Sequence, residues 1–230
     1  MPGEDVPHGR VVSDPGHAET AAASSASVSD PVLWERPASA EAAGALVLLH
    51  GRGGNEHDFF RLHDDLDPDQ RLHVYVPRGP IPVGDGHAVW FDLERPGLLE
   101  HTTSAMESWL DSLPFPREMI AVAGWSQGGA IAFILGLSAR PPPAALIALG
   151  AFFPLWERWE PSLEPPLPPV LIGHGTNDDS VPVAWARLAR RLVEGAGAKV
   201  TYCETGVGHE IDPSWLTEAR VVEGLTAARR

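Results

Sequence analysis

Short runs of apolar residues alternate along the chain with longer segments in which apolar and polar residues are mixed. The runs are rich in valine, leucine, isoleucine and alanine and are bounded by glycine or proline, which is typical of strands buried on both faces of a sheet. The strands predicted in this way span residues 45–49, 72–76, 119–123, 144–149, 169–173 and 198–204. Helices are predicted between and after them at residues 57–66, 98–113, 129–137, 183–194 and 213–228. This alternation predicts an α/β protein with a mostly parallel central sheet and helices on both faces.

Two segments do not follow this alternation. Residues 1–28 consist largely of Pro, Gly, Ala, Ser, Asp and His and contain almost no large apolar side chains. Such a segment cannot bury enough surface to offset its ordering entropy, so we expect a disordered tail over 1–28 and one domain over 29–230, with a weak strand within 27–34. Residues 78–96 contain Pro and Gly at intervals and are expected to form a long loop. No segment between strands is long enough for a large lid.

Composition narrows the classes of partner. Of the 230 residues, 43% are hydrophobic and the net charge is −14, which argues against nucleic acid and anionic membrane surfaces as partners. The single cysteine, Cys203, excludes an internal disulfide and a cysteine-based metal cluster. The N-terminus lacks the features of a signal peptide, and no apolar run approaches the length of a membrane span. We therefore expect a cytoplasmic protein without stable membrane insertion.

The segment around Ser126 has the strongest chemical signal. Gly124-Trp125-Ser126-Gln127-Gly128 joins a predicted buried strand to a predicted helix that is apolar nearly all round. A nucleophilic serine on a tight strand-to-helix turn requires this G-x-S-x-G pattern, because the glycines let strand and helix pass closely. The alternative is an ordinary turn in which Ser126 only caps the helix.

An acid and a base follow Ser126 in the chain order that α/β-hydrolases use. Asp178 lies just past the predicted strand at 169–173, and His209 lies just past the strand at 198–204. Because the carboxyl ends of parallel strands meet at one edge of a sheet, these side chains are expected to converge on Ser126. His209 would accept the proton of Ser126, and Asp178 would orient the imidazole.

Two neighbouring residues compete for these roles. Asp179 can replace Asp178 as the acid, and His174 is a second histidine close by in the sequence. His174 precedes a glycine at a strand end, much as His50 does, and this placement indicates a structural role. Helical ligand spacing or cysteine partners, which a zinc site would need, are not evident in the sequence.

The glycine-rich loop after the first strong strand, residues 50–55, suggests an oxyanion hole. It lacks the Gly-Lys-Ser/Thr of a phosphate-binding loop. A loop of this kind beside the elbow can present the backbone N–H of Arg52, and the N–H of Gln127 supplies a second donor. The alternative is a tight turn without a catalytic role.

Large aromatic residues follow two of the predicted strands, where ligands bind in open α/β sheets. They suggest an apolar substrate pocket, and core packing is the competing interpretation. The residues are Trp90, Phe91, Phe152, Phe153 and Trp156.

Taken together, the motifs resemble the phospholipase/carboxylesterase family of α/β-hydrolases, which includes the acyl-protein thioesterases. They occur in family order and cover about residues 45–225. They are His50-Gly51-Arg52-Gly53, Trp90-Phe91-Asp92, Gly124-Trp125-Ser126-Gln127-Gly128, His174-Gly175 with Asp178 and Val181-Pro182, and Gly208-His209-Glu210.

The resemblance implies an α/β-hydrolase fold, Ser126 as nucleophile with Asp178 and His209 as its partners, and oxyanion donors at Arg52 and Gln127. It also implies short or medium acyl esters, thioesters or lysophospholipids as substrates, no metal or other cofactor, and a homodimer, since several members are dimers. The arginine at position 52 departs from many relatives, which have a small or apolar residue there. Only its N–H is needed for the chemistry, and its side chain either favours an anionic substrate group or pairs with Glu56 or Asp58.

These observations predict a serine carboxylesterase that cleaves short- to medium-chain esters through an acyl-enzyme. The alternatives on the same three residues are a lysophospholipase and an acyl-protein thioesterase. A catalytically silent binding protein with this fold is the alternative of another class.

Overall fold

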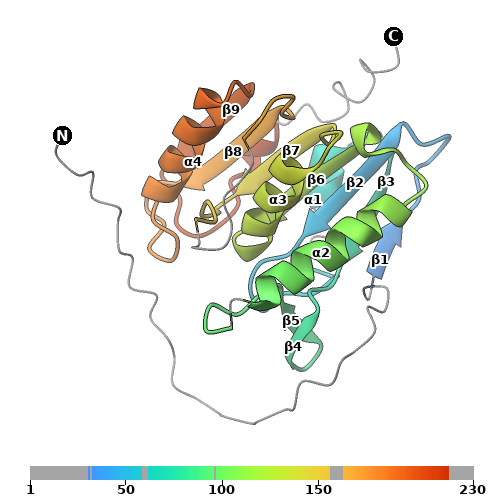
Figure 1. The fold of residues 1–230 in the computed structure, drawn as a ribbon, viewed down its shortest axis with the longest axis horizontal. Coiled ribbons are helices and arrows are strands. Elements are labelled where there is room, and N and C mark those ends of the chain that lie inside the picture. Colours follow the sequence, from blue (N-terminus) through green and yellow to red (C-terminus); the bar gives the residue numbers. More distant parts are fainter. Residues whose placement is uncertain (1–30, 32, 59–61, 96, 156–162, 218–230) are drawn as a thin grey trace.

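The computed structural model describes residues 31, 33–58, 62–95, 97–155 and 163–217, and its centre is a seven-stranded sheet (Figure 1). The strand order is β1-β3-β2-β6-β7-β8-β9, and β1 alone runs antiparallel to its neighbour. The strands are β1 (Leu33–Arg36), β2 (Gly44–Leu49), β3 (Leu72–Pro77), β6 (Ile120–Trp125), β7 (Ala145–Leu149), β8 (Val170–Gly175) and β9 (Val200–Thr205). The predicted α/β fold with a mostly parallel sheet is thereby confirmed, including all six predicted strong strands.

Helices cover both faces of the sheet, as predicted. Alternate residues of β2 point to opposite faces: Ala45 and Val47 pack in one core cluster, and Leu46 and Leu48 pack in another. The first face carries α2 (Gly97–Ser112), α3 (Gln127–Ser138) and α4 (Ala184–Gly195), and the second carries α1 (Leu62–Leu66) and α5 (Pro213–Thr217) (Figure 1). A short 3-10 helix, η1 (Arg117–Met119), leads directly into β6.

Helix α3 explains why its sequence is apolar nearly all round. It lies on the sheet between α2 and α4, and every residue from Gln127 to Leu137 is buried. A helix surrounded by protein on all sides needs no polar face. Its N-terminus follows β6 after a single residue, Ser126, and this close connection positions the site.

The segment predicted to be a long loop contains a hairpin, so that prediction was wrong for part of its length. β4 (Ile81–Gly84) and β5 (His87–Val89) pair antiparallel across the turn Asp85-Gly86. Both turn residues have positive φ, 47° and 81°, as a type I′ turn requires. An Asp-Gly pair is a standard hairpin signal, but the prolines and glycines around it masked the short strands.

Some predictions fall partly outside the described residues. The helix predicted at 57–66 is described as α1 from Leu62, while 57–58 lie in a turn and 59–61 lie outside the described residues. The helix predicted at 213–228 is described as α5 up to Thr217, and the predicted tail also lies outside. None of the helices within the described residues is both long and apolar enough to cross a membrane.

Candidate active site

The predicted site residues gather where the parallel strands end. The loop after β2 contains Arg52, Ser126 follows β6, Asp178 follows β8, and His209 follows β9. These strands are parallel within one sheet, so their carboxyl ends share an edge. Residues far apart in sequence therefore meet there.

Ser126 occupies a strained turn. Its backbone has φ 52° and ψ −115°, a conformation that L-residues with a side chain rarely adopt. A Cβ atom at Gly128 would lie 2.1 Å from the Leu49 carbonyl oxygen, and one at Gly124 would lie 2.2 Å from the Gly128 carbonyl oxygen. Both glycines are thus required by close backbone contact, as the elbow pattern predicts.

This strain predicts a measurable gain when it is relieved. Ser126→Gly is expected to unfold with a free energy about 1 kcal/mol higher than Ser126→Ala, because glycine adopts positive φ without a Cβ clash. Urea denaturation of the two variants measures the difference. The control pair is Ser104→Gly and Ser104→Ala on the exposed face of α2, where glycine should be the less stable residue. Equal stability of the two Ser126 variants would contradict the strain.

A hydrogen-bonded chain joins the three predicted side chains. Ser126 Oγ lies 3.1 Å from His209 Nε2, and His209 Nδ1 lies 2.7 Å from Asp178 Oδ2. Because a carboxylate accepts, His209 donates its Nδ1–H to Asp178, and its Nε2 is left to accept from the serine hydroxyl. The side chain of Ser126 makes no capping hydrogen bond to α3, so the alternative role as a helix cap is not observed.

Asp178 is held by its own loop. Its Oδ1 accepts the backbone N–H groups of Ser180, at 3.0 Å, and Val181, at 2.7 Å. Its side chain is fully buried, whereas Asp179 is exposed. The competing assignment of Asp179 therefore has no support in the geometry.

His174 lies closer to the site than its sequence context suggested. The ring is completely buried, with Nε2 2.7 Å from the Val181 carbonyl oxygen and 3.3 Å from Asp178 Oδ2. Burial lowers the pKa of His174, so the ring is neutral at pH 7 and donates its Nε2–H to Val181. His174 thus braces the loop that holds Asp178, and its position four residues before Asp178 was the available signal.

The two predicted oxyanion donors lie on different segments: Arg52 is in the loop after β2, and Gln127 is the first residue of α3. Ser126 N–H is already bonded to the Leu149 carbonyl oxygen at 2.9 Å. Within the described part of the chain, the N–H groups of Arg52 and Gln127 donate to no other residue. Both amides thus remain available as donors beside Ser126.

His50 fixes the start of this loop. Its Nδ1–H donates to the Gly51 carbonyl oxygen at 2.7 Å, and its Nε2 accepts the Gly79 N–H at 2.9 Å. Burial lowers the pKa of His50, and a neutral ring is what this donor–acceptor pattern requires. Further along, Gly53 N–H donates to the Ala88 carbonyl oxygen at 3.0 Å, which ties the loop to the hairpin.

The side chain of Gln127, which sequence reasoning did not consider, links the elbow to the segment after the hairpin. Its Oε1 accepts the Trp90 N–H at 2.8 Å, and its Nε2 donates to the Phe91 carbonyl oxygen at 2.9 Å. The Trp90 indole N–H in turn donates to the His50 carbonyl oxygen at 2.8 Å. One glutamine and one tryptophan thereby connect the elbow with the loop after β2, the two segments that contain the predicted oxyanion donors.

Most of the aromatic residues predicted to form a substrate pocket pack elsewhere. Trp90 and Phe153 have no exposed surface and Phe91 has 3%, so the structure assigns them to the core instead. Phe152 is partly buried, with its ring against Phe91 at 6.2 Å between centroids. Trp156 lies outside the described residues.

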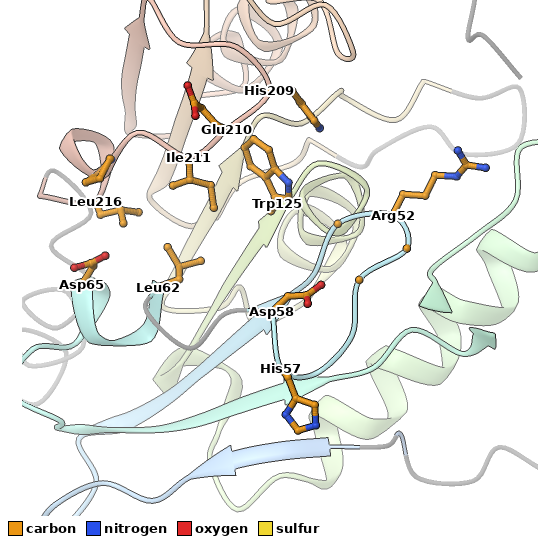
Figure 2. Close-up of a pocket in the computed structure, with 14 residues that line it drawn as sticks. Arg52, His57, Asp58, Leu62, Asp65, Trp125, His209, Glu210, Ile211 and Leu216 are labelled. Carbon is orange, nitrogen blue, oxygen red and sulfur yellow. The ribbon is translucent and has the colours of Figure 1, made fainter. Parts of the chain in front are cut away.

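A cavity of about 660 Å³ borders the site on another side (Figure 2). Its volume falls within the range of small-molecule sites, about 300–1,000 Å³. Trp125 and His209 form one wall, with ring centroids 4.6 Å apart. The cavity is lined by Gly51, Arg52, Gly53, Gly54, His57, Asp58, Leu62, Asp65, Trp125, His209, Glu210, Ile211, Pro213 and Leu216. Of the aromatic residues predicted for the pocket, the four that the structure describes, Trp90, Phe91, Phe152 and Phe153, are not among them.

The described residues contain no group of three or more His, Cys, Asp or Glu side chains placed to hold a metal ion.

Comparisons with known proteins agree with this geometry. A family model described as Phospholipase/Carboxylesterase matches residues 36–221. Acyl-protein thioesterase 1 of Gibberella zeae is 24% identical over 212 residues, covering 79% of this chain and 90% of that protein. Acyl-protein thioesterase 1 of Cryptococcus neoformans is 27% identical over 221 residues, covering 76% and 91%.

Solved structures show the same similarity. The crystal structure of esterase PE8 superposes with a TM-score of 0.71 at 25% identity, covering 87% of this chain and 99% of that one. A carboxylesterase from Bacillus cereus superposes with a TM-score of 0.70 at 25% identity, covering 81% and 93%.

Proposed function

The chain belongs to the phospholipase/carboxylesterase family, and we propose from this membership and from the site geometry that Ser126, His209 and Asp178 hydrolyse carboxylic esters. The observation that carries the proposal is the hydrogen-bonded chain from Asp178 through His209 to Ser126, placed on a strained elbow. A serine hydroxyl is a weak nucleophile until an adjacent base accepts its proton, and this arrangement supplies that base.

The geometry suits a two-step reaction. His209 Nε2 accepts the hydroxyl proton as Ser126 Oγ attacks the carbonyl carbon, and Asp178 stabilises the imidazolium that results. The oxyanion accepts hydrogen bonds from the backbone N–H groups of Arg52 and Gln127. His209 then protonates the leaving alcohol, and the C–O bond breaks to leave the acyl group on Ser126.

Deacylation repeats these steps with water. His209 removes a proton from the water as it attacks the acyl carbonyl, and returns that proton to Ser126 Oγ when the acid departs. These steps use only the three side chains and the two backbone amides that we propose for the site. The reaction is therefore complete on described residues.

A small ester with a short or medium acyl chain is the substrate class we propose. The cavity beside His209 has the volume of a small-molecule site, which supports this proposal. A thioesterase activity has independent support, because the curated relatives named above are acyl-protein thioesterases. A homodimer and a cytoplasmic location stay predictions.

Active-site labelling tests the proposal. A fluorophosphonate probe is expected to add once to the folded protein, and peptide mapping should place the adduct on Ser126. Heat-denatured protein is the control, since an unactivated serine does not react. A series of esters, thioesters and lysophospholipids of increasing acyl length then identifies the preferred class.

Two results would argue against the proposal. Folded protein that takes up no probe and hydrolyses no member of the series would favour a binding protein that retains the fold. An adduct that maps to another residue would contradict Ser126 as the nucleophile.

A further inference from the structure

The side chain of Arg52 is exposed and has no partner among the residues that the structure describes. The sequence allows Arg52 to pair with Glu56 or Asp58, and the structure shows neither pair. Both carboxylate oxygens of Glu56 accept hydrogen bonds from Arg78, one from Nε and one from Nη2. Asp58 Oδ2 accepts the backbone N–H of Asn55 at 3.0 Å. The two acidic residues nearest in sequence are therefore engaged without Arg52.

A third carboxylate near Arg52 is also engaged. Asp92 accepts from Arg95 Nε at 2.8 Å and from the Glu94 N–H at 3.0 Å. Its pKa is lowered chiefly by the hydrogen bond from Arg95, and the positive charge of Arg52 contributes a smaller part. The charge of Arg52 is thus close enough to act on the Asp92 carboxylate, but Arg52 forms no hydrogen bond or ion pair with Asp92.

The position of Arg52 relates its charge to the reacting ester. The same residue that presents an oxyanion N–H carries the guanidinium, so the charge lies within one arginine side chain of the scissile carbonyl. Figure 2 shows this side chain leading away from Asp58 and from the apolar end of the cavity formed by Leu62, Ile211 and Leu216. Arg52 thus lines the cavity while its side chain stays exposed to solvent.

An unpartnered guanidinium in this position has a specific chemical preference. Its planar set of N–H donors matches a carboxylate or phosphate, with which it forms paired hydrogen bonds. The protein as a whole carries a net charge of −14 and repels anions at long range. A local cation at the site would then decide whether an anionic ester is accepted or rejected.

We propose that the Arg52 guanidinium binds an anionic group of the substrate, so that the preferred esters carry a carboxylate or phosphate a few bonds from the scissile carbonyl. The inference rests on the proposed esterase function and specifies its substrate class. An exposed arginine without a partner contributes little to folding, so stability gives no competing reason for its position.

Matched ester pairs test this inference. The acyl-side pair is monoethyl glutarate and the ethyl ester of glutaric monoamide, which differ in charge and hardly in shape. The alcohol-side pair is the acetate ester of 4-hydroxybutyrate and that of 4-hydroxybutyramide. The quantity measured is the ratio of kcat/KM for the anionic ester to that for its neutral partner. Any general effect of a substitution on the oxyanion hole cancels in this ratio.

The wild-type enzyme is expected to have a ratio above one for at least one pair, despite its negative charge. Arg52→Gln should lower that ratio about tenfold, as loss of a charge-assisted hydrogen bond would, and Arg52→Lys should lower it less. The pair that responds identifies which side of the ester carries the anion. Added salt should lower the wild-type ratio and have less effect on Arg52→Gln.

Arg95→Gln is the matched control, because it removes an equal charge from a neighbouring exposed arginine that is bound to Asp92. Its ratio should match the wild-type ratio more closely than that of Arg52→Gln. Equal losses in the two variants, or unchanged ratios in Arg52→Gln for both pairs, would overturn the inference while ester hydrolysis and labelling of Ser126 still support the proposed function. Absence of both hydrolysis and labelling would overturn the two together.

Discussion

Ser126→Ala is expected to lower kcat by about 10⁶-fold, because it removes the atom that attacks the ester. The expected enzyme remains folded. Alanine keeps the Cβ atom, so the backbone strain at φ 52° is unchanged, and the hydroxyl makes no capping bond that the helix would lose. Initial rates on the preferred ester, with the thermal unfolding midpoint of the same preparation, measure both effects.

Ser104→Ala on α2 is the matched control and should retain full activity, because this exposed serine takes no part in the hydrogen-bonded chain of Ser126, His209 and Asp178. Residual activity of Ser126→Ala within about a hundredfold of wild type would identify another nucleophile and contradict the proposed mechanism. Fluorophosphonate uptake by the Ser126→Ala variant would do the same.

The parts of the fold that could be predicted are those that a short stretch of sequence determines. The strands β2, β3, β6, β7 and β8 are buried almost throughout, and burial on both faces is what makes a run continuously apolar. The elbow was predictable because close contact of strand and helix excludes any side chain at Gly124 and Gly128. Convergence of Asp178 and His209 on Ser126 then followed from parallel strands alone.

The parts that were missed depend on tertiary contacts. Nothing in the sequence around Trp90 shows that its indole N–H bonds the His50 carbonyl oxygen, or that its ring is enclosed by the core. An aromatic residue after a strand is equally able to face a ligand or the interior, and only the packing of α2 and α3 decides. The structural role predicted for His174 agrees with its buried ring, but its contact with the Val181 carbonyl oxygen could not be predicted from the sequence.

These missed contacts explain how the elbow and the oxyanion loop keep a common geometry. Gln127 holds the segment at Trp90 and Phe91, and Trp90 holds His50, which begins the oxyanion loop. The segments that carry the two proposed donors, Arg52 and Gln127, are thus joined by one network of buried hydrogen bonds. Catalysis by oriented dipoles requires donors that do not reorganise during the reaction, and a buried network of this kind supplies that rigidity.

Asp178→Asn is expected to lower kcat about 10⁴-fold with little change in KM, because the substitution alters the imidazole tautomer and leaves the shape of the site intact. The amide oxygen of the asparagine can keep the hydrogen bonds from the backbone N–H groups of Ser180 and Val181. The amide nitrogen then takes the place of Oδ2, which faces His209 in the wild type. That nitrogen donates, so His209 must accept at Nδ1 and carry its proton on Nε2. The atom that should receive the Ser126 proton is then already protonated.

Asp179→Asn is the control that separates charge from position. It removes an equal charge from the adjacent residue, which is exposed, and it should leave kcat near the wild-type value. Equal losses in the two variants would indicate a general electrostatic effect of the loop. A large loss of kcat in Asp179→Asn alone would identify Asp179 as the acid. A loss confined to Asp178→Asn would support a specific hydrogen bond to His209, because only that substitution changes the group facing Nδ1.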